Sequence, residues 1–253
     1  MIKSMSKMIS VHNHKCITPC EHADVCYFIH GKHSTEVEFI QDKIEKVIEN
    51  ISGEKQVYYS GCNVLDAGHT YNGYIKGKEE TKHMTISSNV LSEFFGIVNP
   101  SGEATDLICN LQVTVYDRDA LTDMRPIQKM FLIKDQETYD IALNVFHNHE
   151  SHKFIHFPIE HEWAKNNKTN VLTLVHELNQ CENDTLSLDS CLENYVYNKE
   201  CVYKDSYIDL RYDGTVRRCP FSDECHSINY ENPDEMFDIP FEPKCIYKEM
   251  FGE

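Results

Sequence analysis

The chain has 253 residues, 41% of them hydrophobic, which suffices for a core and excludes a disordered chain. Its 24 basic and 41 acidic side chains give a net charge of −17, which disfavours nucleic-acid polymers as partners because no counterion release drives the binding. Without an apolar run near the ~20 residues of a membrane span, or a signal-peptide core at the N-terminus, we expect a cytoplasmic protein that does not engage a membrane.

The apolar pattern predicts short strands alternating with helices or loops. In chain order, it predicts a strand at 8–14, a helix at 34–51, strands at 56–60, 83–87, 111–116 and 129–133, a helix at 135–146, and strands at 154–158 and 171–175. Asp135 is the expected N-cap of the second helix, and Gly53 follows the end of the first. The alternation is typical of an α/β fold with a parallel sheet.

The character of the sequence changes after about residue 178. Two short β signals, at 207–211 and 215–218, flank Asp213 and Gly214, and this pattern predicts a hairpin. We therefore expect two domains, 8–178 and a small cysteine-rich module at 179–253.

The chain carries 11 cysteines, and three of them lie within eleven residues between the first strand and the first helix. In a reducing compartment such a cluster favours metal ligation over disulfides. Three thiolates would leave one iron of a [4Fe–4S] cluster without a protein ligand. The spacing fits equally a structural zinc site with a nearby histidine as fourth ligand. The three cysteines are Cys16, Cys20 and Cys26, and the histidines are His12, His14, His22 and His30.

A cysteine trio after the first strand of a βα series resembles the radical S-adenosylmethionine (radical SAM) superfamily, whose usual spacing is Cys-x3-Cys-x2-Cys. The interval from Cys16 to Cys20 fits, whereas five residues instead of two separate Cys20 from Cys26. Val25 stands where the family has an aromatic residue. Tyr27 follows the third cysteine instead.

Later strand ends add to the resemblance. Ser60, Gly61 and Cys62 look like the family's Gly-Gly-Glu motif with one glycine kept, and Ser88 with Asn89 looks like the end of its third strand. The fourth strand of the family often places a polar residue near the ribose. The SAM-binding residues that the resemblance implies are Ser60, Gly61, Cys62, Ser88, Asn89, Gln112 and Thr114. Cys62 could be a packing residue or a hydrogen donor near the radical, so no catalytic residue is assigned.

The resemblance implies a partial (β/α)6-type parallel barrel, similar to a TIM barrel, and an oxygen-sensitive enzyme. Such an enzyme cleaves SAM reductively at its [4Fe–4S] cluster to a 5′-deoxyadenosyl radical, which abstracts hydrogen from a substrate. The substrate would be a peptide, a small molecule or a nucleotide. An external one-electron reductant, such as flavodoxin or ferredoxin, would be a partner.

A second group of cysteines lies in the C-terminal module. Cys201, Gly214 and Cys219 form the pattern Cys-x12-Gly-x4-Cys, which resembles the SPASM or twitch modules that follow many radical SAM cores. Cys225 and Cys245 would complete the ligands of one auxiliary [4Fe–4S] cluster, or of a zinc knuckle. The alternative to an enzyme is therefore a non-catalytic zinc or iron–sulfur protein that serves interaction or electron transfer.

Overall fold

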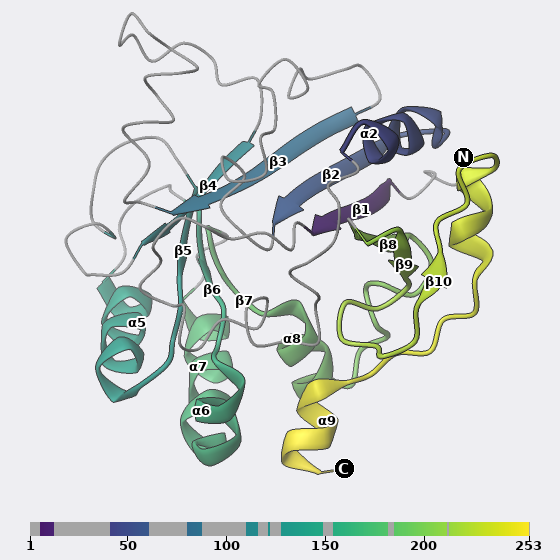
Figure 1. Ribbon diagram of the computed structural model, residues 1–253. Coiled ribbons are helices and arrows are strands. Elements are labelled where there is room, and N and C mark those ends of the chain that lie inside the picture. The colour runs from purple at the N-terminus through teal and green to yellow at the C-terminus, as the bar shows by residue number, and fades with distance from the viewer. Residues whose placement is uncertain are drawn as a thin grey trace, which may run out of the picture. The chain divides into compact units, whose positions relative to one another are not determined.

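The computed structural model describes residues 6–12, 41–60, 80–87, 110–115, 121, 128–148, 154–181, 185–211 and 213–252. The protein has an α/β fold with parallel strands, as the sequence predicts (Figure 1). It forms two compact units, Met1–Leu111 with Tyr203–Lys244 and Gln112–Val202 with Cys245–Glu253. The division into domains at 8–178 and 179–253, which the sequence predicts, stays a prediction.

The first unit contains a mixed sheet with the strand order β10-β9-β8-β1-β2-β3. The pairs β8–β1, β1–β2 and β2–β3 are parallel, and the pairs β8–β9 and β9–β10 are antiparallel. The strands are β1 (Lys7–His12), β2 (Lys55–Ser60), β3 (Glu80–Ser87), β8 (Tyr207–Arg211), β9 (Thr215–Arg217) and β10 (His226–Ser227). Since β1 lies between β8 and β2, it forms backbone hydrogen bonds with a strand on each side.

The predicted hairpin across Asp213 and Gly214 is confirmed by the antiparallel pairing of β8 with β9. Gly214 has a φ of 81°, which glycine adopts without strain, and Oδ1 of Asp213 accepts a hydrogen bond from the Thr215 amide at 2.9 Å. The structure adds that β8, expected in a separate C-terminal module, pairs in parallel with β1. The hairpin therefore extends the sheet of the first unit.

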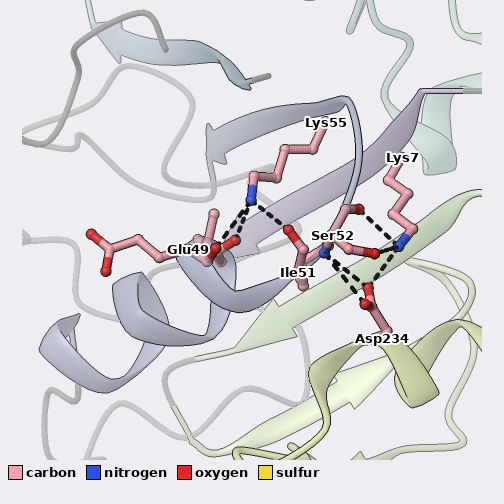
Figure 2. Close-up of polar contacts among 7 residues, drawn as sticks. Lys7, Glu49, Ile51, Ser52, Lys55 and Asp234 are labelled. Carbon is pink, nitrogen blue, oxygen red and sulfur yellow. Dashed lines mark hydrogen bonds and ion pairs between the residues drawn. The ribbon is translucent and has the colours of Figure 1, made fainter. Parts of the chain in front are cut away.

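Helix α2 (Gln41–Asn50) covers one face of this sheet. The Lys55 ammonium group, at the start of β2, donates to the carbonyl oxygens of Ile48 and Ile51, each at 2.7 Å (Figure 2). Because side chains alternate along a strand, Val57 shares the face of Lys55. The apolar side chains of this face, of α2 and of the residue that follows α2 are almost fully buried: Ile9, Val11, Val57, Ile208, Leu210, Ile44, Val47, Ile48 and Ile51.

The C-terminal part of the first unit is attached to the start of the sheet. Oδ1 of Asp234, in the 3₁₀ helix η3 (Pro233–Asp238), lies 2.6 Å from the Lys7 ammonium and 3.1 Å from the Ser52 amide (Figure 2). Arg218, after β9, donates to the carbonyl oxygens of Lys204, Phe237 and Ile239. These polar contacts hold η3 against β1 and the end of α2.

The second unit contains the parallel strands β4-β5-β6-β7, with helices between and after them. Phe146 of α5 packs edge-on against Phe157 of β6, with ring centroids 5.2 Å apart, so α5 covers the face that carries Phe157. The elements are β4 (Asn110–Val115, its last four residues in this unit), β5 (Gln128–Phe131), α5 (Gln136–Asn148), β6 (Ile155–Phe157), α6 (His161–Asn166), α7 (Lys168–Gln180), β7 (Leu186–Leu188), α8 (Ser190–Val196) and α9 (Ile246–Phe251).

Asp135 caps α5 as predicted, because its Oδ1 accepts a hydrogen bond from the Thr138 amide at 2.8 Å. The strand expected at 171–175 is wrong, since these residues lie in α7. Val171, Leu174 and Val175 are buried, at the i, i+3, i+4 spacing of one helix face. A short run of β-branched and aliphatic residues does not distinguish a strand from the buried side of a helix. None of the described helices is long and apolar enough to cross a membrane.

Candidate functional site

The face of the first sheet opposite α2 is polar. Ser10 of β1 lies in register with Tyr58 of β2 on one side and with Asp209 of β8 on the other. Neighbouring residues in register point to the same side of a sheet, so the three side chains form one row. The strands of parallel sheets are usually apolar on both faces. A polar row in this position therefore marks a face suited to binding a ligand.

A buried ion pair lies on this polar face. Nε of Arg211 donates to Oδ2 of Asp209 at 3.0 Å, and both side chains are 0% exposed. Burying two charges costs much of what their attraction contributes, so such a pair is weak evidence of a purely stabilising role. Arg211 ends β8 in register with His12, which in turn is in register with Ser60. Ligands of parallel α/β folds bind at this carboxyl edge of the strands.

Two tyrosines share this polar face. Burial raises the pKa of Tyr207 well above its ordinary value, Asp209 and Tyr203 raise it further, and a hydrogen bond with Ser10 acts in the opposite direction. Burial also raises the pKa of Tyr58, whose hydroxyl donates to Oε1 of Gln56 at 2.6 Å. Both phenols are therefore neutral donors at neutral pH.

The second unit repeats this division of faces. Thr114 of β4, Met130 of β5, His156 of β6 and Ser187 of β7 lie in register, on the face opposite Phe131 and the other buried apolar residues. Nδ1 of His156 lies 3.1 Å from Oγ of Ser187. Burial lowers the pKa of His156, and the Asp189 carboxylate acts in the opposite direction without cancelling the shift. A neutral imidazole thus lies between Met130 and Ser187 in a row of uncharged side chains.

Asp189 follows β7 and connects several groups at the carboxyl edge of this unit. Its Oδ1 accepts from the Cys191 amide at 2.8 Å as the N-cap of α8, and its Oδ2 accepts from the Tyr247 hydroxyl at 3.3 Å. Burial lowers the pKa of His161, the first residue of α6, and this effect outweighs the charges of Asp189 and Glu160, which raise it. The negative charge of Asp189 therefore acts on the pKa of both His156 and His161.

Part of the predicted SAM site lies within the described residues. Ser60 ends β2, in register with His12, and Thr114 is buried on the polar row of the second unit. Gln112 lies in β4, in register with Gln128. The remaining predicted ligands lie outside the described residues: Cys16, Cys20, Cys26, Gly61, Cys62, Ser88 and Asn89.

The four cysteines of the predicted auxiliary cluster are divided between the units. Cys219 is buried and Cys225 exposed in the first unit, whereas Cys201 and Cys245 have intermediate exposure in the second. Their thiolates are suitable donors for iron or zinc. Within the described ranges, no three His, Cys, Asp or Glu side chains are grouped as a metal site. The auxiliary cluster therefore stays a prediction.

No motif in the sequence pointed to the polar residues Asp209, Arg211 and Ser187. In β8 the charged residues alternate with Ile208 and Leu210, a pattern that usually indicates a half-exposed strand. In the structure all five residues of this strand are buried. In β8, charged residues that alternate with apolar ones therefore mark a buried polar face, to which a ligand can bind.

No family model matches the chain, and no curated protein and no solved structure matches it either.

Proposed function

We propose that the protein is a radical SAM enzyme, which cleaves SAM reductively and abstracts hydrogen from a peptide, a small molecule or a nucleotide. The observation that carries this proposal is that the parallel strands of each unit have one apolar and one polar face. An α/β enzyme binds cofactor and substrate at the carboxyl ends of its strands, and the polar face of the first unit reaches that edge at His12, Ser60 and Arg211. The partial (β/α)6-type barrel belongs to the same proposal.

The position of the first cysteine group supports this function. It follows β1 in the sequence, and β1, paired on both sides by parallel strands, ends at the carboxyl edge of the first sheet. Cys16, Cys20 and Cys26 would hold the cluster, and SAM bound there would supply a 5′-deoxyadenosyl radical after one-electron reduction. Ser60 and Thr114 have suitable polar groups to orient a cofactor by hydrogen bonds.

The C-terminal cysteines support an auxiliary cluster through their pattern around the confirmed hairpin. Gly214 turns the chain between Cys201 and Cys219, as the Cys-x12-Gly-x4-Cys resemblance requires. In this proposal Cys225 and Cys245 complete the ligands. An external flavodoxin or ferredoxin would supply the electron.

The test is anaerobic purification followed by incubation with SAM and dithionite. We expect brown protein with absorbance near ~400 nm, about eight irons per chain and formation of 5′-deoxyadenosine. Replacing Cys16, Cys20 and Cys26 together by alanine should abolish 5′-deoxyadenosine while the C-terminal iron remains. Cys181→Ala, at the end of α7, is the matched control and should keep both clusters.

Colourless protein with stoichiometric zinc would contradict the proposal and favour a non-catalytic zinc protein. Brown protein that forms no 5′-deoxyadenosine would favour an electron carrier. Loss of all iron in the triple variant would contradict the assignment of two separate clusters.

A further inference from the structure

The polar row of the second unit places a base-competent side chain beside a hydroxyl. His156 lies at an inner strand of the row, half-buried, with its Nδ1 3.1 Å from Oγ of the exposed Ser187. When Nδ1–H donates to Ser187, Nε2 carries the lone pair and can accept a proton. In this tautomer, which the proposal requires, the histidine is a base at Nε2.

The Asp189 carboxylate acts electrostatically in favour of the positive charge that protonation of His156 would create. Asp189 follows the strand of Ser187 and raises the pKa of His156 against the larger effect of burial. A carboxylate beside a histidine stabilises the imidazolium ion that forms when the ring takes up a proton. The Asp189 side chain is itself held by the Cys191 amide and the Tyr247 hydroxyl.

Among the described residues, other ionisable groups near Asp189 lie at the start of α6 and on α9. His161 and Glu160 are at the start of α6, and Tyr247 of α9 reaches the site through Asp189. Burial raises the pKa of Tyr247 well above its ordinary value, and Asp189 raises it further, so the phenol is neutral. Asp189 is therefore the charge that acts directly on His156.

We propose that His156 is the proton acceptor for a hydroxyl-bearing ligand bound on this face, with Ser187 positioning the ring and Asp189 stabilising the imidazolium ion. In the step, the ligand's O–H bond breaks, its electron pair stays on oxygen, and an N–H bond forms at Nε2. The uncharged row of Thr114, Met130 and Ser187 suits a neutral hydroxyl better than a charged group. The role of His156 as a proton acceptor does not depend on the radical SAM proposal, which would only determine the reaction that this proton transfer serves.

The first experiment follows the histidine side chains of the full chain by ¹⁵N NMR between about pH 4.5 and 8, a range that spans the ordinary pKa of histidine. His156→Gln identifies the signals. We expect His156 to titrate below its ordinary value and to carry its proton on Nδ1 at neutral pH. Ser187→Ala should give a mixture of tautomers, and Asp189→Asn should lower the pKa further. A proton fixed on Nε2, or a pKa at or above the ordinary value, would overturn the proposal.

The second experiment asks whether a reactant can reach the ring, which a purely structural histidine would not require. Diethyl pyrocarbonate reacts with neutral, accessible imidazole nitrogens, and peptide mass spectrometry locates the adducts. We expect an adduct on His156 near pH 7, with His176, exposed on α7, as the internal reference. An unreactive His156 beside a modified His176 would show a structural role. Neither experiment needs iron or SAM, so failure of the radical SAM proposal would leave these outcomes distinguishable.

Discussion

The ammonium group of Lys7 lies 2.6 Å from Oδ1 of Asp234, although the two residues are 227 positions apart. The same carboxylate accepts a hydrogen bond from the Ser52 amide, so it joins β1, the end of α2 and η3. Burial alone would raise the pKa of Asp234, but the hydrogen bonds from Lys7 and Ser52 outweigh it, and the pKa lies below its ordinary value. The ionised carboxylate therefore stabilises the folded first unit.

Replacing Asp234 by asparagine should lower the free energy of unfolding at pH 7 by about 0.5–1 kcal/mol, a small effect because solvent screens a side chain that is 46% exposed. The pKa is lower in the folded than in the unfolded state. The stabilisation is therefore complete above the unfolded value near ~4 and is lost as the pH falls through the folded value. Urea unfolding at about pH 7 and pH 3 should show the difference between wild type and variant shrinking.

Glu49→Gln, on the exposed side of α2, is the matched control for this measurement. It should change the free energy of unfolding at pH 7 by less than about 0.5 kcal/mol. An Asp234→Asn variant that loses as much stability in acid as at neutral pH would show that the ion pair is not the source of the effect.

Replacing Lys55 by methionine tests how α2 is held on the apolar face of the first sheet. The buried ammonium group donates to two carbonyl oxygens at the end of the helix, each at 2.7 Å. The variant leaves these acceptors without that donor, and we expect a loss of about 1–3 kcal/mol in the free energy of unfolding. Lys46→Met, exposed on α2, is the control and should have little effect in the same urea titration. Equal losses in both variants would contradict a specific capping role for Lys55.

Local patterns predicted most of the described elements, because hydrophobic periodicity, caps and turn residues act over a few positions. Asp135 and the Asp213–Gly214 turn are of this kind, and both are confirmed. The error at 171–175 arose where a five-residue apolar run fits both a strand and a helix. The contact of Lys7 with Asp234 could not be predicted, since no local signal relates residues that far apart.

The candidate site was predictable only in part for a similar reason. Thr114 was expected within the strand at 111–116, and it lies in β4, in register with Met130. The burial of Asp209 and Arg211 depends on the parallel pairing of β8 with β1, which brings the C-terminal region back to the first strand. Charged residues that alternate with apolar ones suggest a solvent-facing side until that pairing is known.

The buried pair Asp209–Arg211 provides a sharper test of the polar face. Removing one partner takes away the 3.0 Å ion pair of the other buried charge, so Asp209→Leu and Arg211→Met should each lower the free energy of unfolding by about 3–5 kcal/mol. The double variant should recover most of that loss, because it removes both charges and leaves apolar groups. The exposed pair Lys244–Asp223, with its atoms 3.2 Å apart, is the matched control, and Asp223→Asn should cost less than about 1 kcal/mol.

Urea unfolding of the four proteins in this double-mutant cycle gives the coupling energy of the pair directly. A large coupling with a stable double variant would mean that stability does not require the two charges. Their presence on the face opposite α2 would then be explained by binding of a polar ligand rather than by folding. If the losses of the two single variants simply add in the double variant, the two side chains act independently. The 3.0 Å contact between them would then not determine the stability of β8.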